Sequence, residues 1–479
     1  MKLLIALLLV VIIIAISSVN WRRSVKAVFF ILVIEGALRK WVLPQASEVI
    51  YFLKDFVLLG AYLKYYIFSR QEQKFPIRNH FLNGLILLVI LWCLLQAFNP
   101  SLGSTIIGIF GLKTYLFYIP LIWMMPALFP TEEDLYRFLR AHLLLIIPVG
   151  ILGIIQFFSP PSSPINSYVQ TDVVQVDVAT FVGGDLASQG VRITGTFSYI
   201  NNYAAYLLAC FGLLIPLISI KQQKWWQVAT ILELLLLTIN AFMTGSRSTV
   251  FSSILFLMGY LVIKGLTNPS TIFRIIKPFL IPGILIITAA LFWFRRALDA
   301  FVTRTSSTND ISTRILGTLT EPLSFIQYKA IDGFGTGATH PGSVALRNAL
   351  GLPYGERIPV GFEGEMGRIA LELGPIGFIF WYGLRISIII ALFIVFCKLK
   401  RPLLKQLALA AFLIQGLWIN GQLVFHHTFA IYYWFFTSFV FLLPQLELVT
   451  NWQQQLQWLH FNVQSTYLSD SPDGQSELP

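Results

Sequence analysis

Long apolar runs recur from one end of the chain to the other, and they constrain the fold more than any other feature. Each run is about 20 residues long, which is the length that an α-helix needs to cross the hydrocarbon core of a bilayer. Only 12% of the 479 residues are charged, about half the share that is typical of soluble domains. The runs are continuous and lack the alternation of a membrane β-barrel. The sequence therefore predicts an all-α fold, a polytopic membrane helix bundle.

Polar breaks between the apolar runs predict about thirteen membrane spans. They lie near 2–19, 25–38, 49–68, 81–98, 105–128, 138–158, 199–220, 226–243, 248–264, 278–294, 369–396, 405–424 and 428–447. The second run is short and contains Glu35, so twelve spans remain an alternative. The first run has the charged start of a signal peptide, but a poor cleavage site follows it, and we expect an uncleaved span.

Lysines and arginines in the short connections indicate which side of the membrane each connection faces. Basic sets at 22–26, 64–78, 221–224, 264–277 and 397–405 all fall on one side, which the positive-inside rule assigns to the cytoplasm. The outer side receives 99–104, 159–198, 244–248, 295–368 and 421–428. Arg39 and Lys40 are exceptions to the rule, because they fall on the outer side.

This assignment divides the chain into four parts. They are N-terminal transmembrane helices (1–294, with an outer loop at 159–198), a long extracytoplasmic loop (295–368), C-terminal transmembrane helices (369–447) and a partly disordered cytoplasmic tail (448–479). A long loop without periodicity is uncommon unless it is functional. In the tail, Trp452 and Trp458 predict a short interfacial helix near 451–462.

Several function classes find no support in the sequence. The net charge of +11 lies largely in short loops, where it orients the spans, and it indicates no nucleic-acid partner. We find no Walker motif and no dinucleotide fingerprint, so we expect no cofactor. The cysteines Cys93, Cys210 and Cys397 have no metal-ligand spacing, and the adjacent His426 and His427 lack further ligands nearby in the sequence. We therefore expect no metal site.

Two arginines stand at the mouths of apolar spans on the predicted outer side. Arg192 precedes the span that begins near residue 199, and Arg247 lies in a polar break between two spans. A guanidinium is always charged and is costly to hold near hydrocarbon, so its presence indicates an anion or a partner acid. The competing interpretation is an interfacial arginine that reaches toward water and has no ligand.

Several short motifs occur in an order that resembles the O-antigen ligase/polymerase family. They are Arg192-Ile-Thr-Gly-Thr-Phe with Asn201-Asn202, Thr244-Gly-Ser-Arg247-Ser, Gly333-Phe-Gly-Thr-Gly337 and Glu372-Leu-Gly-Pro-Ile-Gly377. The early Gly36-Ala-Leu-Arg39-Lys40-Trp41 and Tyr51-Phe-Leu-Lys54-Asp55 resemble one subgroup of such proteins. The resemblance covers most of the chain, although each motif is short and degenerate.

The resemblance implies a metal-independent glycosyl transfer on the outer face of the cytoplasmic (inner) membrane. The donor is a glycan on a polyprenyl diphosphate, and the acceptor is another lipid-linked glycan or the lipid A core of lipopolysaccharide. The expected partners are this lipid-linked glycan, the bilayer and other polysaccharide export or assembly proteins. The sequence does not separate a polymerase of O-antigen or exopolysaccharide from a ligase.

The resemblance also implies roles for individual residues. Arg192 and Arg247 are expected to bind the diphosphate, because arginine forks accept phosphate oxygens in pairs. Asn201 and Asn202 are expected to orient the donor, although helix capping explains one of them equally well. Glu372 lies in a family motif and is expected to contact the substrate.

The base that deprotonates the acceptor hydroxyl is open. Family members carry a His-Asn pair about nine residues before the glutamate that corresponds to Glu372, and this chain has Glu363-Gly-Glu365-Met there. His340 is the first candidate, since histidine titrates near neutrality, but its Gly/Pro-rich surroundings also suit an ordinary turn residue. Glu365 and Glu363 are the next candidates, and burial would have to raise their pKa values.

Two further functions remain open on sequence grounds. A secondary transporter or flippase of an anionic lipid or glycan would use Glu35, Asp55 and Glu233 for proton coupling, but we find no internal repeat of the kind that transporters show. An inactive relative that scaffolds an envelope assembly is the other alternative, because the His-Asn pair is missing.

Overall fold

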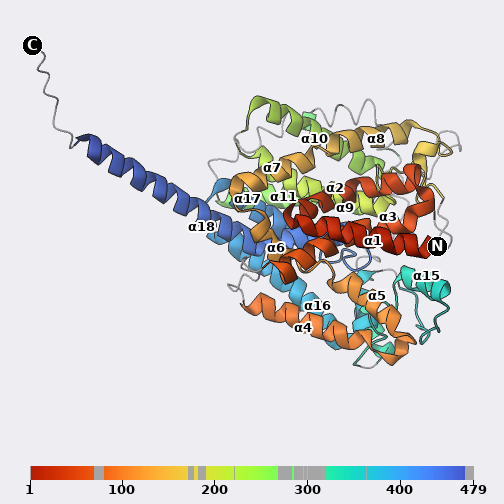
Figure 1. The fold of residues 1–479 in the computed structure, drawn as a ribbon. Coiled ribbons are helices and arrows are strands. Elements are labelled where there is room, and N and C mark those ends of the chain that lie inside the picture. The colour runs from red at the N-terminus through yellow and green to blue at the C-terminus, as the bar shows by residue number, and fades with distance from the viewer. Residues whose placement is uncertain are drawn as a thin grey trace, which may run out of the picture.

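The computed structural model confirms an all-α, multi-pass helix bundle (Figure 1). It describes residues 2–69, 80–170, 177–181, 190–220, 222–267, 320–329, 331–362 and 364–469, with isolated positions between 283 and 317. Within these residues, the one extended pairing is a single bridge between Thr180 and Val191. The predicted span at 278–294 and most of the stretch at 295–319 lie outside the described residues.

The helices follow the apolar runs closely. They are α1 (Lys2–Val19), α2 (Trp21–Ala37), α3 (Ser47–Tyr62), α4 (His80–Ala97), α5 (Thr105–Leu116), α6 (Leu121–Leu128), α7 (Glu132–Leu143), α8 (Ile146–Phe158), α9 (Ile200–Ile218), α10 (Lys224–Met243), α11 (Arg247–Thr267), α15 (Pro341–Leu350), α16 (Glu365–Lys398), α17 (Pro402–Leu417) and α18 (His427–Ser469). The π-helices η1 (Leu38–Val42) and η3 (Leu63–Phe68) extend α2 and α3. Short 3-10 turns lie at Pro44–Ala46, Pro100–Leu102, Pro164–Asn166 and Ile326–Tyr328.

Length and composition identify the membrane spans. In the described part of the chain, 8 helical segments are long and apolar enough to cross a membrane, with α5–α6 and α7–α8 each counted as one segment. The apolar part of α1 and all of α17 are shorter. Helices α2 and α3 carry charged side chains that are buried against other helices. The bundle is therefore that of a multi-pass membrane protein.

The connections separate into two groups, one at each end of the bundle. Those assigned to the outside by charge contact one another: Arg192 Nε donates to the Thr244 carbonyl at 3.0 Å, and Arg347 Nη2 donates to the Leu102 carbonyl at 2.8 Å. We call this the outer end, and α15 marks it in Figure 1. At the opposite, inner end, Arg401 pairs with Glu132 at 2.7 Å. The packing therefore brings together, at one end, connections that the charge pattern assigns to one side of the membrane.

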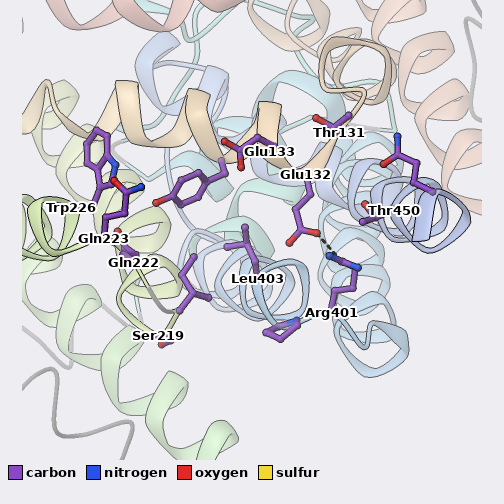
Figure 2. A pocket seen from close by; sticks show the side chains of 14 residues that line it. Thr131, Glu132, Glu133, Ser219, Gln222, Gln223, Trp226, Arg401, Leu403 and Thr450 are labelled. Atoms are coloured by element: carbon purple, nitrogen blue, oxygen red, sulfur yellow. Dashed lines mark hydrogen bonds and ion pairs between the residues drawn. The ribbon is translucent and has the colours of Figure 1, made fainter. Parts of the chain in front are cut away.

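A cavity of about 870 Å³ opens at the inner end between α7, α10, α17, α18 and the connection from α9 to α10. Figure 2 shows polar side chains along its wall, among them Gln222 and Gln223, and the ion pair of Glu132 with Arg401. None of the residues that the sequence singled out for chemistry lines this cavity. The candidate site must therefore be sought at the other end.

The C-terminal segment departs from the prediction. Instead of ending near 447 and giving way to a separate interfacial helix at 451–462, α18 continues through Ser469 as one helix. Figure 1 shows it extending well beyond the bundle. The prediction was wrong because the polar residues around Asn451 were taken as a break, whereas glutamine and leucine in this stretch are good helix formers.

One ion pair is buried between two spans. Arg140 of α7 lies 3.1 Å from Glu233 of α10, and the exposed fractions of the two side chains are 2% and 0%. The guanidinium also stacks on the Trp226 ring, 4.6 Å from its centroid. Removing one member of such a pair leaves an uncompensated buried charge. The pair therefore joins α7 to α10.

We expect Arg140→Ala or Glu233→Ala to destabilise the protein by about 3–5 kcal/mol, measured as thermal unfolding of the purified protein in detergent. Replacing both residues together, as Arg140→Met with Glu233→Leu, should restore most of the loss, because no lone charge then remains.

The matched control lies on the same helix. The Glu133–Arg137 pair of α7 is exposed, with side-chain exposures of 60% and 73%, and Arg137→Ala should change stability by about 1 kcal/mol or less. Equal losses at the two pairs would contradict the interpretation.

Candidate functional site

The loop at 192–198 is held in place by α8. Gln156 Nε2 donates to the Gly195 carbonyl at 3.1 Å, and Gln156 Oε1 accepts from the amides of Thr194 and Gly195 at 3.3 and 2.8 Å. Gly195 has a left-handed φ of +55°, which glycine adopts without strain. We call residues 192–198 the arginine loop. Its backbone is fixed relative to the spans.

The Gly36–Trp41 motif packs against the arginine loop from the other side. A Cβ on Gly36 would lie 2.4 Å from the Thr196 carbonyl oxygen, so only glycine allows this approach. Lys40 Nζ donates to Thr194 Oγ1 at 3.1 Å and to the Gly195 carbonyl at 2.8 Å, and Arg39 Nη1 donates to Ser198 Oγ at 3.1 Å. Both cations lie in η1 and are buried, at 6% and 8% exposure. Their burial explains why they escape the positive-inside rule.

Arg192 and the segment that carries Arg247 are in contact. The Arg192 guanidinium reaches the Thr244 carbonyl, 52 positions along the chain. Gly245 follows with a φ of +62°, and a Cβ there would lie 2.8 Å from Arg192 Nε. Arg247 begins α11 two residues later. The structure therefore brings the two predicted arginine segments together at the outer end.

A pocket of about 350 Å³ lies beside this turn, between α9, α11 and the connection from α17 to α18. Its polar lining includes Asn201, Ser246, Ser248, Asn420, Gln422 and His426. Apolar lining comes from Ala204, Ala205 and Leu208 of α9 and from Phe429 of α18, while α11 also contributes Thr249 and Ser252. The neighbouring Asn202 has a buried Oδ1 with no hydrogen-bond partner among the described residues. The pocket therefore has both polar and apolar walls.

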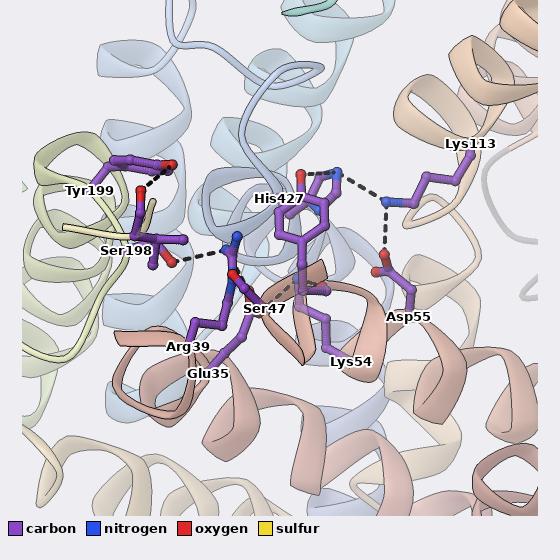
Figure 3. Close-up of polar contacts among 11 residues, drawn as sticks. Glu35, Arg39, Ser47, Lys54, Asp55, Lys113, Ser198, Tyr199 and His427 are labelled. Atoms are coloured by element: carbon purple, nitrogen blue, oxygen red, sulfur yellow. Dashed lines mark hydrogen bonds and ion pairs between the residues drawn. The ribbon is translucent and has the colours of Figure 1, made fainter. Parts of the chain in front are cut away.

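A charged network lies inside the outer half of the bundle (Figure 3). Lys54 Nζ lies 2.7 Å from Glu35, Arg39 lies 3.6 Å from the same carboxylate, and Lys113 Nζ lies 2.7 Å from Asp55. Three cations thus share two carboxylates. Lys40 adds a further basic side chain, whose hydrogen bonds in the described structure go to a hydroxyl and a carbonyl. Within this group, basic side chains therefore outnumber carboxylates.

The charged network continues to His427 at the start of α18. Lys113 Nζ lies 3.0 Å from His427 Nε2, and the Tyr51 hydroxyl lies 3.3 Å from the same nitrogen. The Tyr51 ring also faces the cations of Arg39 and Lys54, at 4.9 and 4.6 Å from its centroid. Tyr51 and His427 thus join helices that are remote in sequence.

Both oxygens of the Glu365 carboxylate have partners within the protein. One carboxylate oxygen lies 2.7 Å from Arg385 Nη1, and the other accepts from the Val424 amide at 3.1 Å. Arg385 in turn donates to the carbonyls of Trp418 and Gly421. The pair therefore holds the connection between α17 and α18, which carries His426 and leads to His427.

The Glu372 carboxylate also accepts hydrogen bonds within the protein, next to the glycine-rich motif Gly333–Gly337. Its carboxylate accepts from the Tyr115 hydroxyl at 2.8 Å, from the Gly337 amide at 3.0 Å, and from the amide and hydroxyl of Thr339 at 2.7 Å each. These four bonds fix residues 337–339 against α5 and α16. The loop that they hold ends at His340.

His340 caps the N-terminus of α15. Its Nδ1 accepts from the Gly342 amide at 3.0 Å, and its ring packs edge-on against Phe110 at 4.9 Å. Burial, reinforced by the charges of Lys113 and Arg368, lowers the pKa of His340 to about 3. The ring is therefore neutral at physiological pH. The third base candidate, Glu363, lies outside the described residues.

Sequence reasoning placed the arginine segments and the supporting glutamates at the outer end, but gave no role to Lys113 or His427. The available signal was the charge of Lys113 inside an apolar run, since a charge within a span is functional by default. Its partners Asp55 and His427 lie far away in the chain. Only the fold reveals that Asp55, Lys113 and His427 are linked by consecutive contacts.

No protein-family model matches this chain, and neither does any curated protein or solved structure. The fold defines the class, a multi-pass α-helical membrane protein. Any particular activity must be argued from the chemistry of the outer end.

We expect Glu372→Ala to destabilise the protein by at least about 2 kcal/mol, because it leaves four buried donors without an acceptor at about 1–3 kcal/mol each. The segment 337–339 should then become open to protease. Thermal unfolding and mapping of the cleavage sites measure the two effects. Glu356→Gln is the control, since Glu356 pairs with Lys329 at the surface. A stable, protease-resistant Glu372→Ala protein that has lost activity would instead favour direct substrate contact by Glu372.

Proposed function

We propose that this protein is a membrane glycosyltransferase that uses a glycan linked to a polyprenyl diphosphate, at the outer face of the cytoplasmic membrane. The observation that carries the proposal is the cluster of buried basic side chains beside the arginine loop, in which four basic side chains face two carboxylates. Burying a charge without a counterion is costly. An anionic headgroup would supply the missing negative charge.

The chemistry of the reaction suits this arrangement. The acceptor hydroxyl attacks the anomeric carbon of the donor sugar, the bond from that carbon to the diphosphate breaks, and the diphosphate lipid leaves with the negative charge. Fixed cations stabilise the charge that develops on the leaving oxygen. Arg192 and Arg247 are the proposed diphosphate ligands, and Arg39 and Lys40 support the same region from behind the arginine loop.

The pocket beside Asn201 supports a lipid-linked donor. Its polar side chains would face a glycan and a diphosphate, and its apolar side chains, chiefly those of α9, would face a polyprenyl chain. The proposed role of Asn201 is to orient the donor, and Asn202 lies next to it. Products of such a reaction are an extended glycan, as in O-antigen or exopolysaccharide polymerisation, or a glycan joined to lipopolysaccharide.

We expect Arg192→Lys to reduce polymer formation by about 10²–10³-fold without changing the protein level, because a point charge cannot replace the planar fork. Glycans extracted from a deletion strain that expresses the variant are sized on a gel. Arg137→Lys, at an exposed position of α7, should behave as the unaltered protein. Full-length polymer from the Arg192→Lys protein would refute the proposed role.

Deletion of the gene then separates the two forms of the reaction. Loss of long chains with single capped units retained identifies a polymerase, whereas accumulation of lipid-linked long chains identifies a ligase. An unchanged glycan profile would contradict both.

A further inference from the structure

Three polar side chains that line the pocket beside Asn201 are not used by the rest of the protein. They are Asn201, near the start of α9, and Asn420 and His426, in the connection from α17 to α18. In the part of the chain that the structure describes, these three side chains make no hydrogen bond. One cavity of about 350 Å³ therefore collects unused hydrogen-bonding groups from segments that are remote in sequence.

The lining of this pocket is polar without being charged. Among the described residues that line it, none is a lysine, an arginine, an aspartate or a glutamate. The titratable side chain among them is His426, and desolvation, reinforced by the charge of Arg368, lowers the pKa of His426 to about 4. The imidazole is therefore neutral at physiological pH.

This set of groups selects a class of ligand. Two amides and a neutral imidazole offer both donors and acceptors, and a sugar hydroxyl likewise donates and accepts. A phosphate or a carboxylate only accepts, and it is bound most strongly by charged donors. An ammonium group would need a carboxylate to pair with it. The lining therefore favours an uncharged polyhydroxyl compound, and the apolar side chains of α9 and Phe429 suit the C–H face of a sugar ring.

The wall that the connection from α17 to α18 contributes is fixed from behind. Arg385 Nη2 donates to the carbonyls of Trp418 and Gly421 at 2.5 and 3.3 Å. Its ion-pair partner Glu365 accepts from the Val424 amide at 3.1 Å. A wall that is already ordered loses little conformational freedom when a ligand binds. The polar groups on this connection are therefore held in place before a ligand arrives.

We propose that this pocket is the subsite for an uncharged sugar of the lipid-linked glycan, held by Asn201, Asn420 and His426. That the sugar belongs to a lipid-linked donor rests on the proposed function, whereas its lack of charge follows from the lining. A uronic acid would bring a carboxylate next to walls whose described residues offer no cation, and a desolvated charge without a partner is costly. The pocket volume lies within the range of about 300–1,000 Å³ that is usual for small-molecule sites.

The test compares sugars that differ only in charge. Glucose and glucuronate form one pair, and galactose and galacturonate form another, because a carboxylate replaces the hydroxymethyl group in the acidic member of each. Saturation-transfer NMR is recorded on the full chain in nanodiscs. We expect binding of at least one neutral sugar, and an affinity about tenfold or more lower for its acidic counterpart. Equal or tighter binding of the acidic sugars, or no binding of either neutral sugar, overturns the proposal.

Variants of the lining residues test whether the sugar binds in this pocket. We expect Asn420→Ala and His426→Phe each to weaken binding of the neutral sugar about three- to tenfold. His426→Gln keeps a donor and an acceptor and should retain most of the affinity. Asn451→Ala, at an exposed position of α18, is the control and should bind as the unaltered protein does. Unchanged affinity in both the Asn420→Ala and His426→Phe proteins overturns the proposal, and thermal unfolding confirms that each variant is folded.

A change of charge at Asn420 tests the selectivity itself. Asn420→Arg supplies a cation, so we expect glucuronate to gain affinity relative to glucose about tenfold or more. Asn420→Asp has nearly the size of the original side chain and should weaken glucuronate binding further. If the ratio of the two affinities is the same in both variants as in the unaltered protein, the lining does not set the preference and the proposal is wrong.

The outcomes also separate this proposal from the proposed function, because sugar binding is measured without turnover. Selective binding of a neutral sugar by a protein whose deletion leaves the glycan profile unchanged would support the subsite and contradict glycosyl transfer. A glycan defect in the Arg192→Lys strain, together with no preference for neutral sugars, would support glycosyl transfer and contradict the subsite.

Discussion

A charge inside a membrane helix bundle must be compensated by other parts of the chain, and the outer half of this protein is built around that constraint. Glu35 and Lys54 pair between α2 and α3, and Asp55 pairs with Lys113 of α5. Each pair joins two helices at a buried point where neither lipid nor water solvates the charge. Arg39 then carries the charged network to Ser198 in the arginine loop. The loop owes its position to charges in helices that are distant in sequence.

Two buried glutamates have a second organising role. Glu372 and Glu365 lie on the first two turns of α16, and each holds a different outer segment by accepting its backbone hydrogen bonds. One segment ends at His340 and the other leads to His427. The two glutamates therefore fix the segments that lead to His340 and His427. Residue type alone suggested that a glutamate here would be a base or a substrate ligand, and the hydrogen-bond partners favour a supporting role.

The sequence predicted the helices of the fold much better than the side-chain contacts of the candidate site. Membrane spans depend on local length and polarity, so most apolar runs became helices close to their predicted bounds, while α18 ran past its predicted end because nothing in the chain breaks it there. The sequence also predicted that the Arg192 and Thr244 segments lie on one side of the membrane, and the two segments are in contact. The partnership of Lys113 with His427 spans 314 positions. No periodicity or spacing encodes such a pair, which exists only once α5 and α18 are packed.

The same reasoning explains why the chemical role of a histidine cannot be derived from its typical pKa. A histidine was expected to be the base because free imidazole titrates near neutrality. In the fold, burial and nearby cations keep His340 neutral, and the Gly342 amide occupies its lone pair. A ring in that state can donate a hydrogen bond but has no lone pair left to take a proton. If the proposed glycosyl transfer is correct, the base must then be a group whose lone pair remains available.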